Sequence, residues 1–213
     1  MKEVCNGCLL ASVKRGMRDC PFCRAPKPDE SQALAMIRKR VDKGDPKAIF
    51  NLGNKYCSGQ YGLVKDVTRA VELHERAAEL GVKEAHFNLG CTYAEGTDVE
   101  KDMAKAIKHY EAAAMCGHVA SRHNLGYEEG MAENYDLALQ HFLIAAKLGH
   151  ENSLSNVKSF FMNGLANKAD YAAALRGYQH AIDEMSSPDR DKAKKMGVDA
   201  IKAAAAPVQR RPS

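Results

Sequence analysis

The sequence lacks any apolar run that approaches the roughly 18 residues needed for a membrane-spanning helix. Residues Met1 to Val13 also lack the uninterrupted apolar stretch of a secretory signal. We therefore expect a protein that has no membrane partner and is located in the cytosol or the nucleus.

The sequence also lacks the signatures of common enzyme sites. Its eight histidines form no His-Glu-x-x-His or similar pattern with a carboxylate, and no phosphate loop, nucleophile elbow or dinucleotide-binding glycine motif is present. The charge of +4 arises from 31 basic and 27 acidic residues scattered along the chain, so there is no strong field for phosphate. These absences disfavour catalysis by such motifs and disfavour nucleic acid as a partner.

What the sequence does contain is one pattern repeated four times. Each copy begins with a glycine, followed by a small residue four positions later and an apolar residue eight positions later. The starting glycines are Gly44, Gly81, Gly117 and Gly149, at spacings of 37, 36 and 32 residues. Each copy then has two alanines seven residues apart, with a larger residue between them: His74, Tyr110, Phe142 or Tyr178. Seven residues are about two helical turns, so the two alanines share one helix face.

The pattern predicts an all-α protein, an α-solenoid of four helical hairpins of about 36 residues each. One hairpin cannot bury its apolar face alone, but stacked hairpins can. We place the repeats at about 44–80, 81–116, 117–148 and 149–185. A helix within 29–43 should cover the first repeat, and Ser187-Pro188 should begin a C-terminal capping helix over 186–206. Residues 207–213 are expected to be a disordered tail.

Two details concern the helices of each hairpin. In three copies the first helix contains a glycine (Gly53, Gly90 and Gly126). A glycine inside a helix costs roughly 1 kcal/mol relative to alanine, so we expect the partner helix to approach closely there. The second helices are each preceded by a residue that can cap exposed N–H groups: Asp66, Asp102, Asn134 and Asp170.

The first two copies share a longer motif. Asn51 to Gly59 and Asn88 to Gly96 both follow Asn-Leu-Gly-x-x-Tyr-x-x-Gly, and their second helices end in Ala-Ala-x-x-Gly. This motif resembles the Sel-one-like repeats (SLRs), relatives of tetratricopeptide repeats, over about Asp29 to Met185. The third copy is two residues shorter after Gly126, and the fourth has Lys158 in place of the glycine. The resemblance implies a right-handed superhelix that serves as a scaffold or adaptor for proteins or peptides and has no chemistry of its own.

Every copy has an asparagine two residues before the helix glycine or its replacement: Asn51, Asn88, Asn124 and Asn156. Asparagine is a poor helix former, so four at one register suggest a row of amides on one face. The resemblance to tetratricopeptide repeats places this row on the concave surface, where such amides hold extended peptides. The alternative is that each asparagine bonds a neighbouring helix, as buried polar groups usually do.

The N-terminal residues 1–28 form a cysteine-rich module. Cys5, Cys8, Cys20 and Cys23 follow the pattern C-x2-C-x11-C-x2-C, which predicts a closed structural zinc site of four thiolates. The module has too little apolar material to fold unaided, so zinc would supply its folding energy. Free or redox-active thiols are the alternative. The other cysteines, Cys57, Cys91 and Cys116, lie in helical patterns and are interpreted as small core residues in a reducing compartment.

The second cysteine pair and its flanking residue, Cys20-Pro21-x-Cys23-Arg24, resemble the last ligand pair of RING fingers. The resemblance implies ubiquitin ligation, with an E2 enzyme as partner and Arg24 contacting its ubiquitin. A RING finger has eight ligands around two zincs, and only the second half is present here, so a single shared zinc is our own inference. Three interpretations remain open: a protein-binding scaffold, an E3 ubiquitin ligase that holds substrate on its repeats, and a repeat protein whose zinc module is purely structural.

Overall fold

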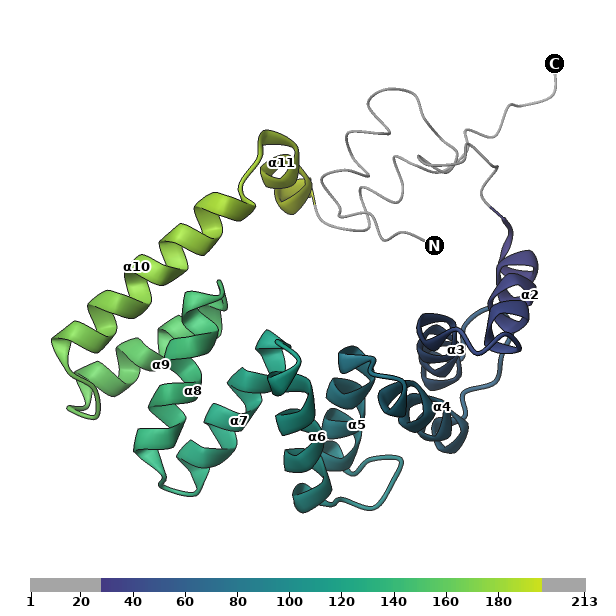
Figure 1. The fold of residues 1–213 in the computed structure, drawn as a ribbon, viewed down its shortest axis with the longest axis horizontal. Coiled ribbons are helices and arrows are strands. Elements are labelled where there is room, and N and C mark those ends of the chain that lie inside the picture. Colours follow the sequence, from purple (N-terminus) through teal and green to yellow (C-terminus); the bar gives the residue numbers. More distant parts are fainter. Residues whose placement is uncertain (1–27, 197–213) are drawn as a thin grey trace. The chain divides into compact units, whose positions relative to one another are not determined.

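The computed structural model describes residues 28–196, and within that range the chain is helical and contains no strand. Within Glu30 to Ile182 the helices follow one another in chain order, each beside the next (Figure 1). Their bounds are α2 Glu30–Val41, α3 Pro46–Ser58, α4 Val67–Glu79, α5 Lys83–Glu95, α6 Met103–Met115, α7 Val119–Met131, α8 Tyr135–Lys147, α9 Glu151–Met162, α10 Lys168–Met185 and α11 Pro188–Met196. None of the described helices is both long and apolar enough to cross a bilayer.

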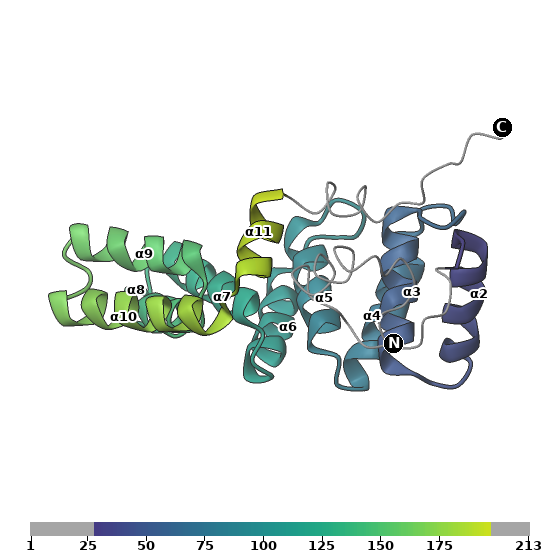
Figure 2. The same ribbon diagram turned by 90° about the horizontal axis from the view of Figure 1, so that it is seen from above.

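Helical hairpins repeat along Glu30 to Ile182, which forms one compact unit. Helices α3 and α4, α5 and α6, and α7 and α8 pair within hairpins, and each hairpin packs on the next through α4 with α5, α6 with α7 and α8 with α9 (Figure 2). The prediction of an all-helical solenoid of repeated hairpins is confirmed. Helix α11 and the last turn of α10 belong to a second unit. The predicted zinc module and the tail 207–213 lie outside the described residues.

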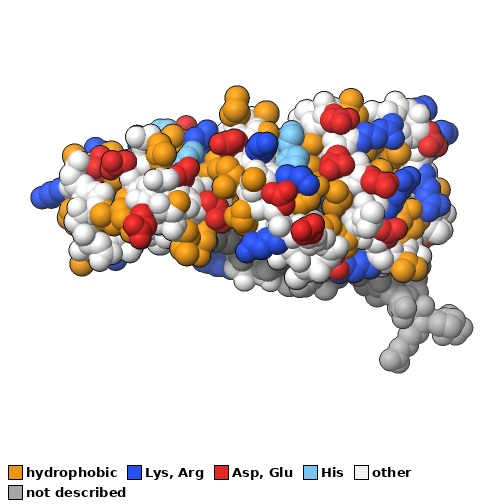
Figure 3. Space-filling model, turned by 90° about the horizontal axis from the view of Figure 1, so that it is seen from below, with side chains coloured by type: hydrophobic (Ala, Val, Ile, Leu, Met, Phe, Trp, Pro, Cys, Tyr) orange, Lys and Arg blue, Asp and Glu red, His pale blue; other side chains and the backbone are white. Residues whose placement is uncertain are grey.

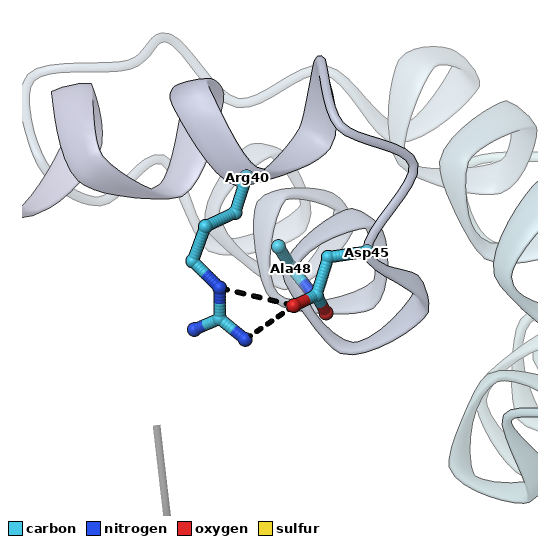
Figure 4. A network of polar contacts seen from close by, with 3 residues as sticks. All are labelled: Arg40, Asp45 and Ala48. Atoms are coloured by element: carbon cyan, nitrogen blue, oxygen red, sulfur yellow. Dashed lines mark hydrogen bonds and ion pairs between the residues drawn. The ribbon is translucent and has the colours of Figure 1, made fainter.

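Helix α2 lies where the sequence predicts a cover for the first repeat. Its Leu34 is buried in a core shared with α3, α4 and α5. The junction with α3 is polar, because Asp45 caps α3 by accepting the backbone N–H of Ala48 at 3.1 Å. The same carboxylate accepts two N–H groups of Arg40, at 2.6 and 3.1 Å (Figure 4). The arginine, together with the cap hydrogen bond, lowers the pKa of Asp45.

The capping predictions are right for two hairpins and wrong for two. Asp66 and Asp102 accept the N–H groups three residues ahead, both at 2.9 Å. Asn134 makes no such bond, because its amide instead donates to Glu129 at 2.8 Å. Asp170 lies inside α10, where it exchanges hydrogen bonds with Asn167 in a reciprocal capping pair. The sequence pattern thus placed the start of α10 a few residues too late.

Close approach of the two helices explains the helix glycines. A Cβ atom built on Gly53 would lie 2.7 Å from the His74 ring, one on Gly90 would lie 2.5 Å from the Tyr110 ring, and one on Gly126 would lie 2.8 Å from the Phe142 ring. These distances are shorter than real carbon contacts, so the ring of the second helix occupies the space that a side chain would need. The rings are 2–3% exposed and lie between the buried alanines of the same helix.

The fourth repeat lacks this contact. Lys158 replaces the glycine and is exposed, and Tyr178, at the ring position, is only partly buried. Helices α9 and α10 instead meet through the stacked rings of Phe161 and Tyr171, whose centroids are 5.5 Å apart. Ala174 is buried in a core with α8 and α9. The last hairpin is therefore held by different contacts from the first three.

The glycine contact gives a direct test. Gly90→Ala should lower the free energy of unfolding by about 1–3 kcal/mol, because overpacking against Tyr110 outweighs the higher helix propensity of alanine. Gly130→Ala is the matched control, since its Cβ would meet Ala138 at an ordinary 3.8 Å. It should be neutral or stabilising by up to about 1 kcal/mol. Urea unfolding followed by circular dichroism measures both. Equal effects would contradict the close-approach explanation.

Candidate partner-binding surface

The four asparagines predicted to form a binding row lie at one register of the first helices, on α3, α5, α7 and α9. Each precedes a buried apolar residue, namely Leu52, Leu89, Leu125 or Val157. Asn51 is exposed, and Asn88, Asn124 and Asn156 are partly buried. The register is therefore shared, but the surroundings of the four amides differ.

Asn88 forms a hydrogen bond between the first two repeats. Its Nδ2 group donates to Oδ1 of Asn54 at 2.9 Å, and the same oxygen lies 3.0 Å from Nε2 of His74. Asn54 thus links α3 to both α4 and α5. At this position the structure agrees with the alternative that the asparagine bonds a neighbouring helix.

Tyr110 occupies the corresponding place between the second and third repeats. Its hydroxyl donates to the Sγ atom of Cys91 at 3.6 Å and also forms a hydrogen bond with Asn124. Burial, followed by the contact with Cys91, raises the pKa of the phenol above its usual value, so it stays protonated. Asn124 therefore also has a partner on a neighbouring helix.

Asn51 and Asn156 differ from the two central asparagines. Within residues 28–196 neither side-chain amide has a hydrogen-bond partner in the chain. Asn156 faces the third repeat, where the ring at the equivalent position is Phe142, which has no polar atom. It lines a pocket of about 250 Å³ together with Tyr127, Phe142 and Phe160. These two amides are the ones whose bonding capacity is open to a partner.

Two histidines cap the first helices of the third and fourth repeats. His118 and His150 follow the repeat glycines and cap α7 and α9. Nδ1 of His118 accepts the backbone N–H of Ser121 at 3.2 Å, and Nδ1 of His150 accepts that of Ser153 at 3.3 Å. An Nδ1 atom that accepts carries no proton, so both caps require neutral imidazole. Burial lowers the pKa of both side chains, which favours this form.

Two histidine pairs were not predicted, because their members come from different helices. His86 and His109 join α5 to α6 through their Nδ1 atoms at 3.0 Å. The rings of His123 and His150 contact each other at a tilt of 39° with centroids 4.5 Å apart, and Nδ1 of His123 lies 2.9 Å from the Ser153 hydroxyl. Burial is the main cause that lowers the pKa of His86, His109 and His123. We interpret these pairs as neutral contacts between helices.

Acid should therefore destabilise the fold. Burial lowers the pKa of His74 from 6.5 to about 4, so the folded state prefers the neutral ring. The neutral ring stabilises the fold fully above about pH 6.5, and this stabilisation is lost as the pH falls towards about 4. The loss is about 2 kcal/mol at pH 5. Urea unfolding at pH 7.5 and pH 5 should show a smaller loss for His74→Phe than for the unchanged protein. His180→Phe, on an exposed position of α10, is the control. Equal losses in all three proteins would contradict the assignment.

The cysteines divide into two groups. Cys5, Cys8, Cys20 and Cys23, together with Arg24, lie outside the described residues. Of the others, Cys91 is partly buried beside Tyr110, whereas Cys57 and Cys116 are exposed near the ends of α3 and α6, so their interpretation as core residues is wrong. No group of three potential metal ligands occurs among residues 28–196.

Charge on the helices is mixed. On the face drawn in Figure 3, acidic and basic side chains are interspersed with exposed hydrophobic ones. Ion pairs such as Lys65 with Asp98, at 2.9 Å, are exposed and contribute little to stability. The surface drawn there shows no extended patch of a single sign.

The comparison with known proteins agrees with the repeat geometry. The family model described as Sel1 repeat matches residues 46–82, 83–118 and 119–150, which are the three hairpins with the glycine contact. A Sel1 repeat protein from Oxalobacter formigenes, solved by crystallography, is 31% identical with a TM-score of 0.55, covering 60% of this chain and 98% of that one. A protective antigen of uropathogenic Escherichia coli with an SLR fold has a TM-score of 0.65 at 24% identity, covering 90% of this chain and 40% of that one.

Curated relatives are longer. Protein sel-1 homolog 2 of Homo sapiens is 31% identical over 133 residues, which are 61% of this chain and 19% of that protein. DAP3-binding cell death enhancer 1 of Mus musculus is 28% identical over 98 residues, 46% of this chain and 19% of that protein. The chain thus spans about a fifth of the length of these relatives. The repeat matches and the solved relative together show that the chain belongs to the Sel1 repeat family.

Proposed function

We propose that this chain is an interaction scaffold or adaptor that binds partner proteins or peptides on the surface of its solenoid. Sel1 repeat proteins act as protein-interaction scaffolds, and one relative, DAP3-binding cell death enhancer 1, is named for binding DAP3. The observation that carries the proposal is the difference within the asparagine row. Asn88 and Asn124 are bonded between repeats, whereas Asn51 and Asn156 keep amides that the described chain does not use.

An amide in this position suits a peptide backbone, because it can donate and accept at once. The row as first predicted comprises Asn51, Asn88, Asn124 and Asn156. The hydrogen bonds between repeats support two different roles for these asparagines. The two central asparagines fix the spacing of the hairpins, and the two outer ones offer their amides to the partner.

The two roles can be separated by substitution. The double variant Asn51→Ala/Asn156→Ala should keep its melting temperature but lose a defined set of co-purified proteins, quantified by mass spectrometry. Asn88→Ala should cost about 1 kcal/mol of stability, because it removes a donor to Asn54. Gln140→Ala, which removes an exposed amide from α8, is the control for capture. A double variant that keeps every partner would disprove the role of the outer amides.

We also propose that Cys5, Cys8, Cys20 and Cys23 bind one structural zinc ion. The support is the paired spacing of the four thiols, since a single catalytic dithiol would need one pair only. Exposed Cys57 and Cys116 supply a matched comparison.

Purified protein should contain about one zinc per chain by elemental analysis. Cys8→Ser/Cys20→Ser should lose the metal, whereas Cys57→Ser/Cys116→Ser should retain it. Protein that is free of zinc as isolated and does not take it up would refute the site.

The RING-type alternative rests on the resemblance at Cys20 to Arg24 and requires more than zinc. It requires that the zinc-loaded protein accelerate discharge of ubiquitin from an E2 enzyme and that Arg24→Ala abolish this effect.

A further inference from the structure

The junction between the third and fourth repeats differs from the two before it. In the earlier junctions a polar atom of the ring, from His74 or Tyr110, is bonded to the residue after the helix glycine. At the third junction Phe142 offers no polar atom, and the residue after the glycine is Tyr127, which is 55% exposed. The third junction therefore lacks the hydrogen bond that the ring forms at each of the first two junctions.

A pocket of about 250 Å³ occupies this junction. Its walls come from α7, α8, α9 and the turn after α9, and they include Tyr127, Met131, Phe142, Phe160 and Leu165. Met131 is 68% exposed and Leu165 is 39% exposed, so the apolar wall is open to solvent. Small-molecule sites usually measure about 300–1,000 Å³, and this smaller volume suits one large side chain of a peptide.

Asn156 supplies the polar group of the pocket. Its amide lies beside the aromatic wall and has no hydrogen-bond partner within residues 28–196, unlike its counterparts Asn88 and Asn124. An aromatic wall with one free amide can hold an apolar side chain and bond the backbone that carries it. Ser159 and Asn163 continue the same wall along α9 as uncharged polar residues.

The charge around the pocket indicates the partner. Residues 123–146, which provide Tyr127, Met131 and Phe142, contain four carboxylates and no lysine or arginine, although the whole chain has a net charge of +4. The carboxylates are Glu128, Glu129, Glu133 and Asp136. The basic residues at the two ends of this stretch lie against other parts of the chain: Arg122 donates to the Ala114 carbonyl, and Lys147 packs where Gly177 of α10 has no side chain. Neither the four carboxylates nor the exposed Lys158 of α9 line the pocket itself, so the carboxylates outnumber the exposed basic residue on the elements around it.

We propose that this pocket binds an extended basic segment of a partner protein, with one large apolar side chain in the pocket. The Asn156 amide bonds the backbone of that segment, and the surrounding carboxylates attract its lysine or arginine residues. The proposal rests on the scaffold function above and narrows it to one site and one chemical class of partner. A complementary charge mainly raises the association rate and the specificity, while the buried side chain holds the complex.

The test uses the full chain and a library of random ten-residue peptides with no net charge bias. Selected peptides should combine one leucine, methionine, phenylalanine or tyrosine with several arginines or lysines. Fluorescence anisotropy then measures the affinity of a selected peptide for each variant. Tyr127→Ser and Asn156→Ala should each weaken binding about fivefold or more, while Met115→Ser, at an exposed position on α6, should leave it unchanged. Circular dichroism checks that each variant is folded.

Charge is tested separately by Glu133→Gln/Asp136→Asn, which changes two exposed carboxylates without changing their size. Binding should weaken about threefold at low salt, and the difference should vanish at about 0.5 M salt. Selection of acidic or uncharged peptides, no selection at all, or affinities that the pocket variants leave unchanged would overturn the inference. Self-association that Tyr127→Ser abolishes would also overturn it and would assign the pocket to a second copy. The scaffold function itself is a separate outcome: it fails if the unchanged full chain co-purifies with no defined set of proteins.

Discussion

The contact between a glycine of one helix and a ring of the next fixes each of the first three hairpins. Because Gly53, Gly90 and Gly126 have no side chain, the ring can lie directly on the backbone of the first helix, and the alanines on either side of the ring can be buried. A cost of about 1 kcal/mol for glycine in a helix is offset by this burial. The distance between the two helices then sets the surface that each hairpin offers to its neighbour, so the stacking of the repeats depends on the same contact.

The type of ring determines whether neighbouring repeats are linked by hydrogen bonds. The imidazole of His74 and the phenol of Tyr110 bring a polar atom to the junction, and this atom takes part in the bonding around Asn88 and Asn124. Phe142 packs on its glycine as well as the other rings do but leaves Asn156 without a partner. The same glycine–ring contact therefore occurs at two junctions with a polar link and at one junction with an open pocket. This is possible because the ring packs on the glycine through its carbon atoms, whereas the link between repeats needs a polar atom on the same side chain.

The sequence allowed the hairpins to be predicted because their signals are local. Glycines and alanines at fixed spacing, and the caps Asp66 and Asp102, act within a few residues of their own position. The failures concern choices between competing partners. Asn134 bonds Glu129 instead of capping, and α10 begins at Lys168 with Asn167, rather than Asp170, in the capping position. The asparagine register was visible in the sequence, but which amides are free was not, since the partners of Asn88 and Asn124 lie on other helices, at Asn54 and Tyr110.

The position of the open pocket follows from the linear organisation of a solenoid. Each hairpin contacts only its neighbours, so a change in one repeat is felt at its own two junctions and not in the rest of the row. Replacing the glycine by Lys158 removes the close contact in the fourth hairpin, and α9 and α10 meet instead through Phe161 and Tyr171. The central glycine contacts of the first three repeats are unaffected. The end of the row can therefore diverge from the repeat pattern without unfolding the middle, and a binding pocket at this junction costs the scaffold less stability than one between the first two repeats would.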